Sequence, residues 1–157
     1  MFVAGALGLA AAGLAGLVRG VDVPAECVRA HLRPLARIAD GQLAARLGAT
    51  SAIDVSDGLV ADAGHVARGS GVTLVLDAAA LLAVGGSALS LAAQALSVDP
   101  LGLALSGGDD YALVVTGPRA LDAHFARVGV VEAGGGSVVV LRDGRPVDAP
   151  VGYDHLG

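Results

Sequence analysis

The segment from Ile53 to Leu59, with the sequence IDVSDGL, places two carboxylates and one hydroxyl within four residues. Asp54, Ser56 and Asp57 all supply oxygen atoms. Hard divalent cations such as Mg²⁺ prefer oxygen ligands, and they often combine one or two carboxylates with the phosphate oxygens of a substrate. The residue types and their spacing therefore permit a metal-assisted phosphate site. The competing interpretation is structural, because Ser or Asp before a helix is commonly an N-cap.

The elements around this motif decide between the two interpretations. The pattern predicts the end of a buried strand over residues 52–55 and a helix over residues 58–68, which Gly69 would end. Helix N-termini and the carboxyl ends of strands in open sheets both favour anionic ligands. Ser56 or Asp57 alone would more often be a cap. Asp54 lies within the apolar strand pattern, where an unpaired charge is costly, so capping and a metal or phosphate role stay equally open.

A second candidate site is the segment SGGDDY, from Ser106 to Tyr111. Paired glycines allow the backbone to approach a ligand closely. The two acids that follow, Asp109 and Asp110, could hold a cation or a hydrogen-bonding substrate. Taken alone, the segment fits a solvated turn better than a binding site. A Walker A loop is excluded because the chain contains no lysine.

The length and composition indicate one domain with an aliphatic core. The chain has 157 residues, of which 54% are hydrophobic and only 3% aromatic, and its mean hydropathy is +0.69. All ten basic residues are arginines, and the net charge of −5 argues against a nucleic-acid partner. The single cysteine, Cys27, excludes an internal disulfide and a cysteine-based zinc cluster.

The first 18 residues carry no charged side chain, which raises the alternative of a membrane span. The run is near the minimum length for spanning and is rich in Ala and Gly, and no basic region precedes it as in a signal peptide. We therefore predict a strand over residues 2–4, a glycine turn and a buried helix to Val18, with no membrane partner.

Strands and helices interleave along the rest of the chain, without a repeat or an evident linker. The patterns predict helices over 25–31, 38–47, 87–96 and 118–128, strands over 72–76, 101–105, 111–116, 130–131 and 137–141, and a hairpin turn at 142–145. This alternation implies a sheet covered by helices.

The order of the motifs strongly resembles the C-terminal domain of the thiamine-monophosphate kinases, members of the aminoimidazole-ribonucleotide synthetase superfamily. The resemblance covers essentially the whole chain. It rests on GALG and AAAGL within residues 5–14, Arg33-Pro34 with Arg37 and Gly41, GAT at 48–50, IDVSDGL, Asp62, SGV at 70–72, LSGGDDY at 105–111 and GYDH at 152–155. It implies an α+β fold in which a mixed sheet is covered by helices in three layers, with residues 1–157 as a single domain.

The resemblance also implies a reaction and roles for individual residues. The family transfers the γ-phosphate of ATP to thiamine phosphate, giving thiamine diphosphate, in the cytoplasm and with Mg²⁺. Asp54 and Asp57 match its Mg²⁺-binding aspartates, and Ser56 matches a residue that contacts ATP. Asp109 falls where the family usually has a glutamate that contacts the substrate. Tyr153 falls where an aromatic residue lies against the substrate ring.

Several positions depart from the family pattern. Leu9 stands where the family often has Asp, Ala36 replaces a proline, Asp109 is one methylene shorter than Glu, and Ala112 replaces a second glutamate. The family's N-terminal domain, which carries further Mg²⁺-binding aspartates and ATP contacts and builds a homodimer, has no counterpart in the sequence. We therefore expect weak or no kinase activity from this chain alone.

Two other functions stay open at this stage. One keeps the superfamily and changes the substrate, as in a phosphoribosyl-amidine cyclase or a selenophosphate- or hydrogenase-maturation-type enzyme. The terminal GYDH together with IDVSDGL favours the thiamine kinase over these enzymes. The other is a degenerate domain that binds a nucleotide or a partner without turnover, which the altered acids would favour.

Overall fold

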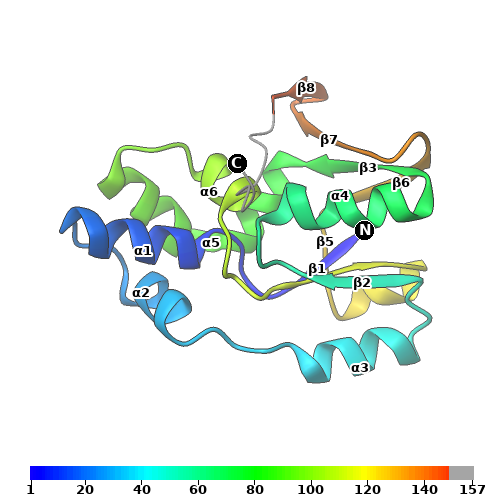
Figure 1. The fold of residues 1–157 in the computed structure, drawn as a ribbon, viewed down its shortest axis with the longest axis horizontal. Helices are drawn as coiled ribbons and strands as arrows, with labels where there is room; N and C mark the ends of the chain where they lie inside the picture. Colours follow the sequence, from blue (N-terminus) through cyan, green and yellow to red (C-terminus); the bar gives the residue numbers. More distant parts are fainter. Residues whose placement is uncertain (149–157) are drawn as a thin grey trace.

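In the computed structural model, which describes residues 1–148, the strands form two separate four-stranded sheets with helices packed around them (Figure 1). The first sheet has the order β2-β4-β1-β5 and is antiparallel throughout. The second has the order β6-β3-β7-β8 and is mixed, because β3 and β7 run parallel while the other pairs are antiparallel. The predicted α+β class with a mixed sheet is confirmed, and the division into two sheets is the feature that the sequence patterns do not show.

The elements have the following bounds. The first sheet contains β1 (Phe2–Ala4), β2 (Ser51–Asp54), β4 (Leu113–Thr116) and β5 (Ala126–Arg127). The second contains β3 (Val72–Asp77), β6 (Gly129–Ala133), β7 (Ser137–Arg142) and β8 (Arg145–Val147). The helices are α1 (Leu9–Arg19), α2 (Ala25–Leu32), α3 (Ile38–Arg46), α4 (Leu59–Ser70), α5 (Ala78–Leu96) and α6 (Pro100–Ser106), with a short 3₁₀ helix η1 (Arg119–Ala123).

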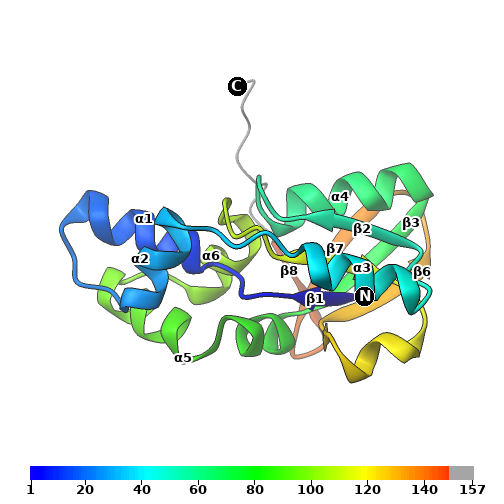
Figure 2. The same cartoon turned by 90° about the horizontal axis from the view of Figure 1, so that it is seen from below.

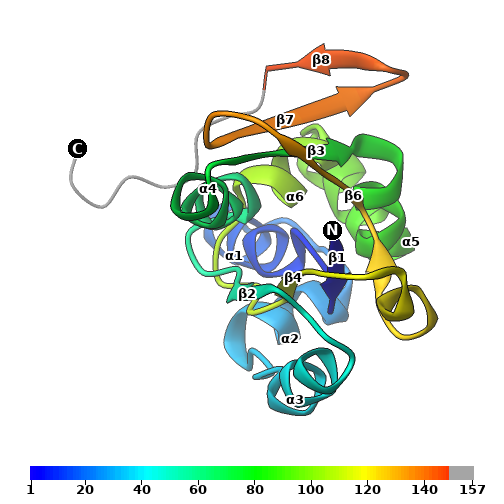
Figure 3. The ribbon, with the colours of Figure 1, turned by 90° about the vertical axis from the view of Figure 1, so that its right-hand side faces the viewer.

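The helices fall into two groups. Figure 2 shows α1, α2, α5 and α6 gathered at one end of the molecule, beside the sheets. Helix α4 contacts strands of both sheets and lies at the side of the space between them (Figure 3). The main core lies in this region and is aliphatic, as the composition predicts. Its fully buried side chains include Leu7, Leu59, Leu74, Leu76, Leu81 and Leu89.

The N-terminal segment forms a strand and a buried helix, as predicted. All three residues of β1 are buried, and β1 lies inside its sheet between β4 and β5. Helix α1 follows and packs closely on α2, since a Cβ at Gly13 would come within 2.1 Å of the Cys27 carbonyl oxygen. Within the described part of the chain, only α5 is long and apolar enough to cross a membrane. It bends at Gly86 and packs on α1 and α6, as the core helix of a globular domain does.

Two predicted elements are wrong. Residues 101–105 belong to helix α6 rather than to a strand, because the Asp99 carboxylate accepts a hydrogen bond from the Leu101 amide at 3.0 Å and Pro100 occupies the first turn. A short apolar run does not distinguish a strand from a buried helix. The predicted helix over 118–128 shortens to η1, because residues 126–127 pair with β1 instead.

A helix end also differs from its prediction. Helix α4 continues through Gly69 and ends at Ser70, where Gly71 adopts the left-handed conformation at φ 63°. The strand that precedes α4 and the helix itself otherwise lie where the sequence places them. The acidic motif therefore occupies a strand-to-helix turn, as expected.

Candidate functional site

The two motifs that the sequence keeps far apart form one structure. Strands β2 and β4 are paired, and their hydrogen bonding continues beyond the strand ends into both motifs. The Val55 amide donates to the Ala112 carbonyl, the Tyr111 amide to the Val55 carbonyl, and the Asp109 amide to the Ser56 carbonyl, each at 2.9 Å. In Figure 1 the turn before α4 and the loop after α6 accordingly run side by side.

Glycines make this close approach possible. A Cβ at Gly108 would lie 2.4 Å from the Ser56 carbonyl oxygen, and a Cβ at Gly107 would lie 2.3 Å from the Leu103 carbonyl oxygen. Gly58 has φ +115° and would bring a Cβ within 3.0 Å of the Ser106 backbone. Gly108 and Gly58 therefore let the two motifs approach, and a side chain at either position would push them apart. A side chain at Gly107 would instead clash with the α6 backbone.

A groove of about 750 Å³ runs along this junction. Its polar side comes from the two motifs and includes Ser56, Asp57, Asp109 and Tyr111. Its apolar side comes from helix α1 and includes Leu14. A groove with one apolar wall and a few convergent polar groups is typical of a small-molecule binding site.

Asp54 is exposed, so the inference that it would be buried is wrong. Strand β2 is at the edge of its sheet, and Ala52 and Asp54 face outward while Ser51 and Ile53 are partly buried. Asp54 lines a neighbouring cavity of about 350 Å³ rather than the main groove. Tyr111 lines both cavities, so they adjoin at this side chain.

The alternative in which Ser56 caps the helix is not what the structure shows. The N-cap residue of α4 is Gly58, which has no capping side chain, and the Ser56 hydroxyl donates to Asp57 at 3.4 Å. The missed residue is Asp62, in the first turn of α4. Its carboxylate accepts hydrogen bonds from the amides of Ser56 at 2.9 Å and Asp57 at 3.0 Å. The signal in the sequence was an acid in the first helical turn, which favours such bonds.

Three carboxylates interact at the start of α4. Burial raises the pKa of Asp62, the two backbone hydrogen bonds lower it, and the negative charges of Asp57 and Asp54 raise it. The two outer acids are thus close enough to affect the buried one. Within residues 1–148, no three Asp, Glu, His or Cys side chains converge as a preformed metal cluster. Two carboxylates are nevertheless a suitable donor set for Mg²⁺ when phosphate oxygens and water complete its coordination.

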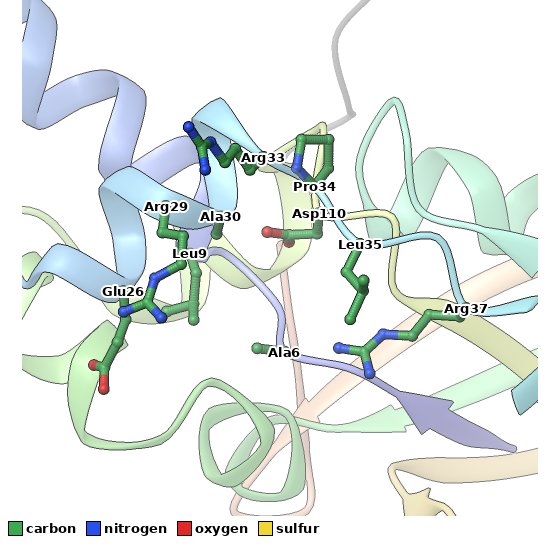
Figure 4. Close-up of a pocket in the computed structure, with 10 residues that line it drawn as sticks. All are labelled: Ala6, Leu9, Glu26, Arg29, Ala30, Arg33, Pro34, Leu35, Arg37 and Asp110. Atoms are coloured by element: carbon green, nitrogen blue, oxygen red, sulfur yellow. The ribbon is translucent and has the colours of Figure 1, made fainter. Parts of the chain in front are cut away.

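The two acids of the second motif have different environments. Asp109 is exposed and lines the main groove. Asp110 points the other way, where its carboxylate accepts hydrogen bonds from the amides of Gly8 and Ala10 at the start of α1. Figure 4 shows Asp110 at a separate pocket of about 270 Å³, beneath the chain that carries Arg33. Burial raises the pKa of Asp110 to about 6, although these amides oppose the shift.

The loop that carries Asp109 has an unusual backbone. Asp109 has φ 62° and Tyr111 has φ 48°, in the left-handed region that residues other than glycine seldom adopt. Such conformations persist when neighbouring contacts impose them, and they are common at binding sites. Here the hydrogen bonds to Ser56 and Val55 impose them.

The departures from the family pattern have different structural settings. Ala112 is fully buried and its carbonyl accepts the Val55 hydrogen bond, so a glutamate here would require the burial of a charge. Ala36 is exposed in the connection between α2 and α3. Leu9 begins α1 next to the amides that bind Asp110. Tyr153 lies outside the described residues.

The fold and the groove define an α+β domain that several solved structures share. A structure of thiamine-monophosphate kinase from Aquifex aeolicus has a TM-score of 0.79 and 33% sequence identity, and the match covers 95% of this chain and 50% of that one. A second, described as AaThiL complexed with AMPPCP and TMP, has a TM-score of 0.81 and 31% identity over 99% of this chain and 50% of that one. A hydrogenase maturation protein, HypE, shares the fold with a TM-score of 0.68 at 15% identity.

Sequence comparison gives the same relationship. Thiamine-monophosphate kinase of Mycobacterium tuberculosis is 43% identical over 155 residues, and the match covers 99% of this chain and 46% of the relative. The Escherichia coli enzyme is 37% identical over 173 residues, and the match covers 99% of this chain and 52% of that enzyme. No protein-family model matches. The chain thus spans about half the length of these relatives, and the resemblance to the C-terminal domain of thiamine-monophosphate kinases is confirmed.

Proposed function

We propose that this chain is the C-terminal domain of a thiamine-phosphate kinase, which transfers the γ-phosphate of ATP to thiamine phosphate and forms thiamine diphosphate. The observation that carries the proposal is the convergence of both motifs on one groove. Relatives with up to 43% identity are named for this reaction, and one similar structure was solved with AMPPCP and TMP.

We assign the phosphate end of the site to the first motif. Asp54 and Asp57 would hold Mg²⁺, and Ser56 would contact ATP from the turn before α4. Phosphoryl transfer depends mainly on positioning and on neutralising the phosphate charge, rather than on a strong base. When bound, Mg²⁺ supplies that neutralisation. The contribution of the chain is to hold the Ser56 hydroxyl and the Asp57 carboxylate in a turn fixed by hydrogen bonds, with the Asp54 carboxylate at the adjoining end of β2.

We assign the thiamine end to the second motif and the C-terminal segment. Asp109 lies at the groove, where its carboxylate could bind the substrate. Tyr153 would place an aromatic face against the cationic thiazolium, which cation–π attraction favours. These two residues remain predictions from the family resemblance.

We further propose that a second domain completes the site. Two carboxylates are a partial ligand set, and half of each relative has no counterpart here. That N-terminal half would add metal and ATP ligands, build a homodimer and operate in the cytoplasm with this domain. Leu14, Leu17 and Val18 on α1 are exposed beside the groove, as expected of a surface that another domain covers.

Calorimetry combined with an assay of ADP release tests this proposal. We expect saturable binding of Mg-AMPPCP and of thiamine phosphate to the chain, with ADP release from Mg-ATP and thiamine phosphate at or near background. Binding of phosphoribosyl ligands in place of thiamine phosphate would favour a cyclase-type or maturation-type enzyme of the same fold. Failure to bind both Mg-AMPPCP and thiamine phosphate would overturn the kinase assignment.

A non-catalytic binding domain is the second candidate. It is favoured by the shortened acid at Asp109 and by the buried Ala112, where the family has glutamates. This candidate predicts binding of Mg-AMPPCP, but no ADP release from Mg-ATP and thiamine phosphate even after the N-terminal half of the Mycobacterium tuberculosis relative is added. Recovery of ADP release in that mixture would contradict it.

A further inference from the structure

We propose that Asp62 is a positioning residue, which fixes Ser56 and Asp57 in the orientation needed to bind the metal and phosphate groups. The inference takes its ligand, a magnesium nucleotide, from the proposed function. The hydrogen bonds between Asp62 and the turn do not depend on that proposal. Neither the motif resemblance nor the comparisons give Asp62 this role.

The contact geometry is specific. One carboxylate oxygen of Asp62, Oδ2, accepts hydrogen bonds from two consecutive amides, those of Ser56 at 2.9 Å and Asp57 at 3.0 Å. Asp62 is only 4% exposed, so water competes poorly for these bonds. Hydrogen bonds to a charged group are stronger than those between neutral groups. Asp62 therefore ties the turn that carries both candidate ligands to the first turn of α4.

The turn joins the helix through a glycine, which has no side chain that could cap α4. Gly58 separates Asp57 from α4 and adopts φ +115°, a conformation available mainly to glycine. On the helix side, the hydrogen bonds from Asp62 supply the constraint. Together with the bond from the Asp109 amide to the Ser56 carbonyl, they fix the backbone from which the Ser56 hydroxyl and the Asp57 carboxylate project.

The geometry separates Asp62 from the groove. Its carboxylate is directed at the two backbone amides of the turn. The Asp62 carboxylate does not line the groove, which separates it from residues that would touch the ligand.

The chain offers a matched control in Asp77. Its carboxylate accepts a hydrogen bond from the Ala80 amide at 2.8 Å, at the start of α5. It is thus another acid that binds a backbone amide at a helix start, but its partner is Ala80 rather than the amides of Ser56 and Asp57. Asp77→Ala should reproduce the general effect of losing such an acid without disturbing Ser56 and Asp57.

The test measures amide hydrogen exchange and Mg-AMPPCP affinity in Asp62→Ala, Asp62→Asn and Asp77→Ala. We expect Asp62→Ala to accelerate exchange at the Ser56 and Asp57 amides and to weaken Mg-AMPPCP binding 10- to 100-fold, the usual range for residues that orient a metal ligand. Asp62→Asn keeps an acceptor oxygen and should retain affinity within about threefold. Asp77→Ala should leave both readouts at wild-type values.

Other outcomes overturn the proposal. Unchanged Mg-AMPPCP affinity in Asp62→Ala would overturn it. An equal loss of affinity in Asp62→Ala and Asp77→Ala would also overturn it. If Asp62→Asn loses as much Mg-AMPPCP affinity as Asp62→Ala, the charge of Asp62 has a direct role and the positioning proposal is wrong. If Asp62→Ala does not fold, the affinity of Asp62→Asn decides the question. If the wild-type chain binds no Mg-AMPPCP, the proposed function fails, and exchange at the two amides alone then decides whether Asp62 orders the turn.

Discussion

At the residue scale, the acids of the two motifs divide into those that face a cavity and those that hold the backbone. Asp57 and Asp109 line the groove, whereas Asp62 and Asp110 accept hydrogen bonds from backbone amides. The sequence marks Asp57, Asp109 and Asp110 as members of candidate sites, but it shows neither the role of Asp62 nor this division. Whether an acid faces a cavity or a helix start depends on tertiary contacts, here the packing of the second motif against α1.

Asp110 predicts a pH dependence of stability. Its pKa rises from 3.8 to about 6 in the folded chain, so the folded state binds a proton more tightly than the unfolded state. The contribution of this group is therefore fully present below pH 3.8 and is lost as the pH rises through about 6. A shift of about two units corresponds to roughly 3 kcal/mol.

Urea unfolding of the wild type and of Asp110→Asn tests that dependence. The measurements run from pH 4 to pH 7, about the range in which this carboxyl ionises. Asparagine cannot ionise, so the decline in the free energy of unfolding over this range should become shallower than in wild type. An equal decline in both proteins would show that another group controls it.

At the element scale, local signals determined which predictions succeeded. The strand-turn-helix around Asp54 has clear apolar spacing and was predicted nearly to its ends. The run at 101–105 was ambiguous because strand and buried helix share the same composition, and the decisive cap at Asp99 lies outside it. Residues 126–127 form a strand only because β1, from the far end of the chain, is available to pair with them.

The approach of the two motifs predicts a specific sensitivity to a methyl group. Gly108→Ala would bring a Cβ within 2.4 Å of the Ser56 carbonyl oxygen, and relieving this overlap should cost about 1–3 kcal/mol of unfolding free energy.

Gly102→Ala is the matched control for this change. Gly102 lies inside α6 with no atom within 4 Å of the added Cβ, so alanine should be neutral or stabilise by up to about 1 kcal/mol. Chemical unfolding of both variants gives the comparison. Equal stability of the two would mean that the motifs do not pack as tightly as described.

At the scale of the whole molecule, the site arises from pairing between distant segments. The sequence predicts two separate candidate motifs, and each alone has a plausible structural explanation. Only the pairing of β2 with β4 joins them, and a contact at that separation leaves no periodic signal in either segment. The same pairing places β2 at a sheet edge, which is why Asp54 is exposed although it lies in an apolar run.

The most direct test of the central claim, that the joined motifs bind a magnesium nucleotide, is calorimetric titration of Mg-AMPPCP into wild type, Asp57→Asn and Asp143→Asn. Asp143 is an exposed acid in the turn between β7 and β8, so its substitution makes the same chemical change away from the groove. We predict wild-type affinity in Asp143→Asn and a loss of about tenfold or more in Asp57→Asn, as expected when a charged contact is removed. Equal affinity of all three proteins, or no binding to the wild type, would contradict the assignment of this groove.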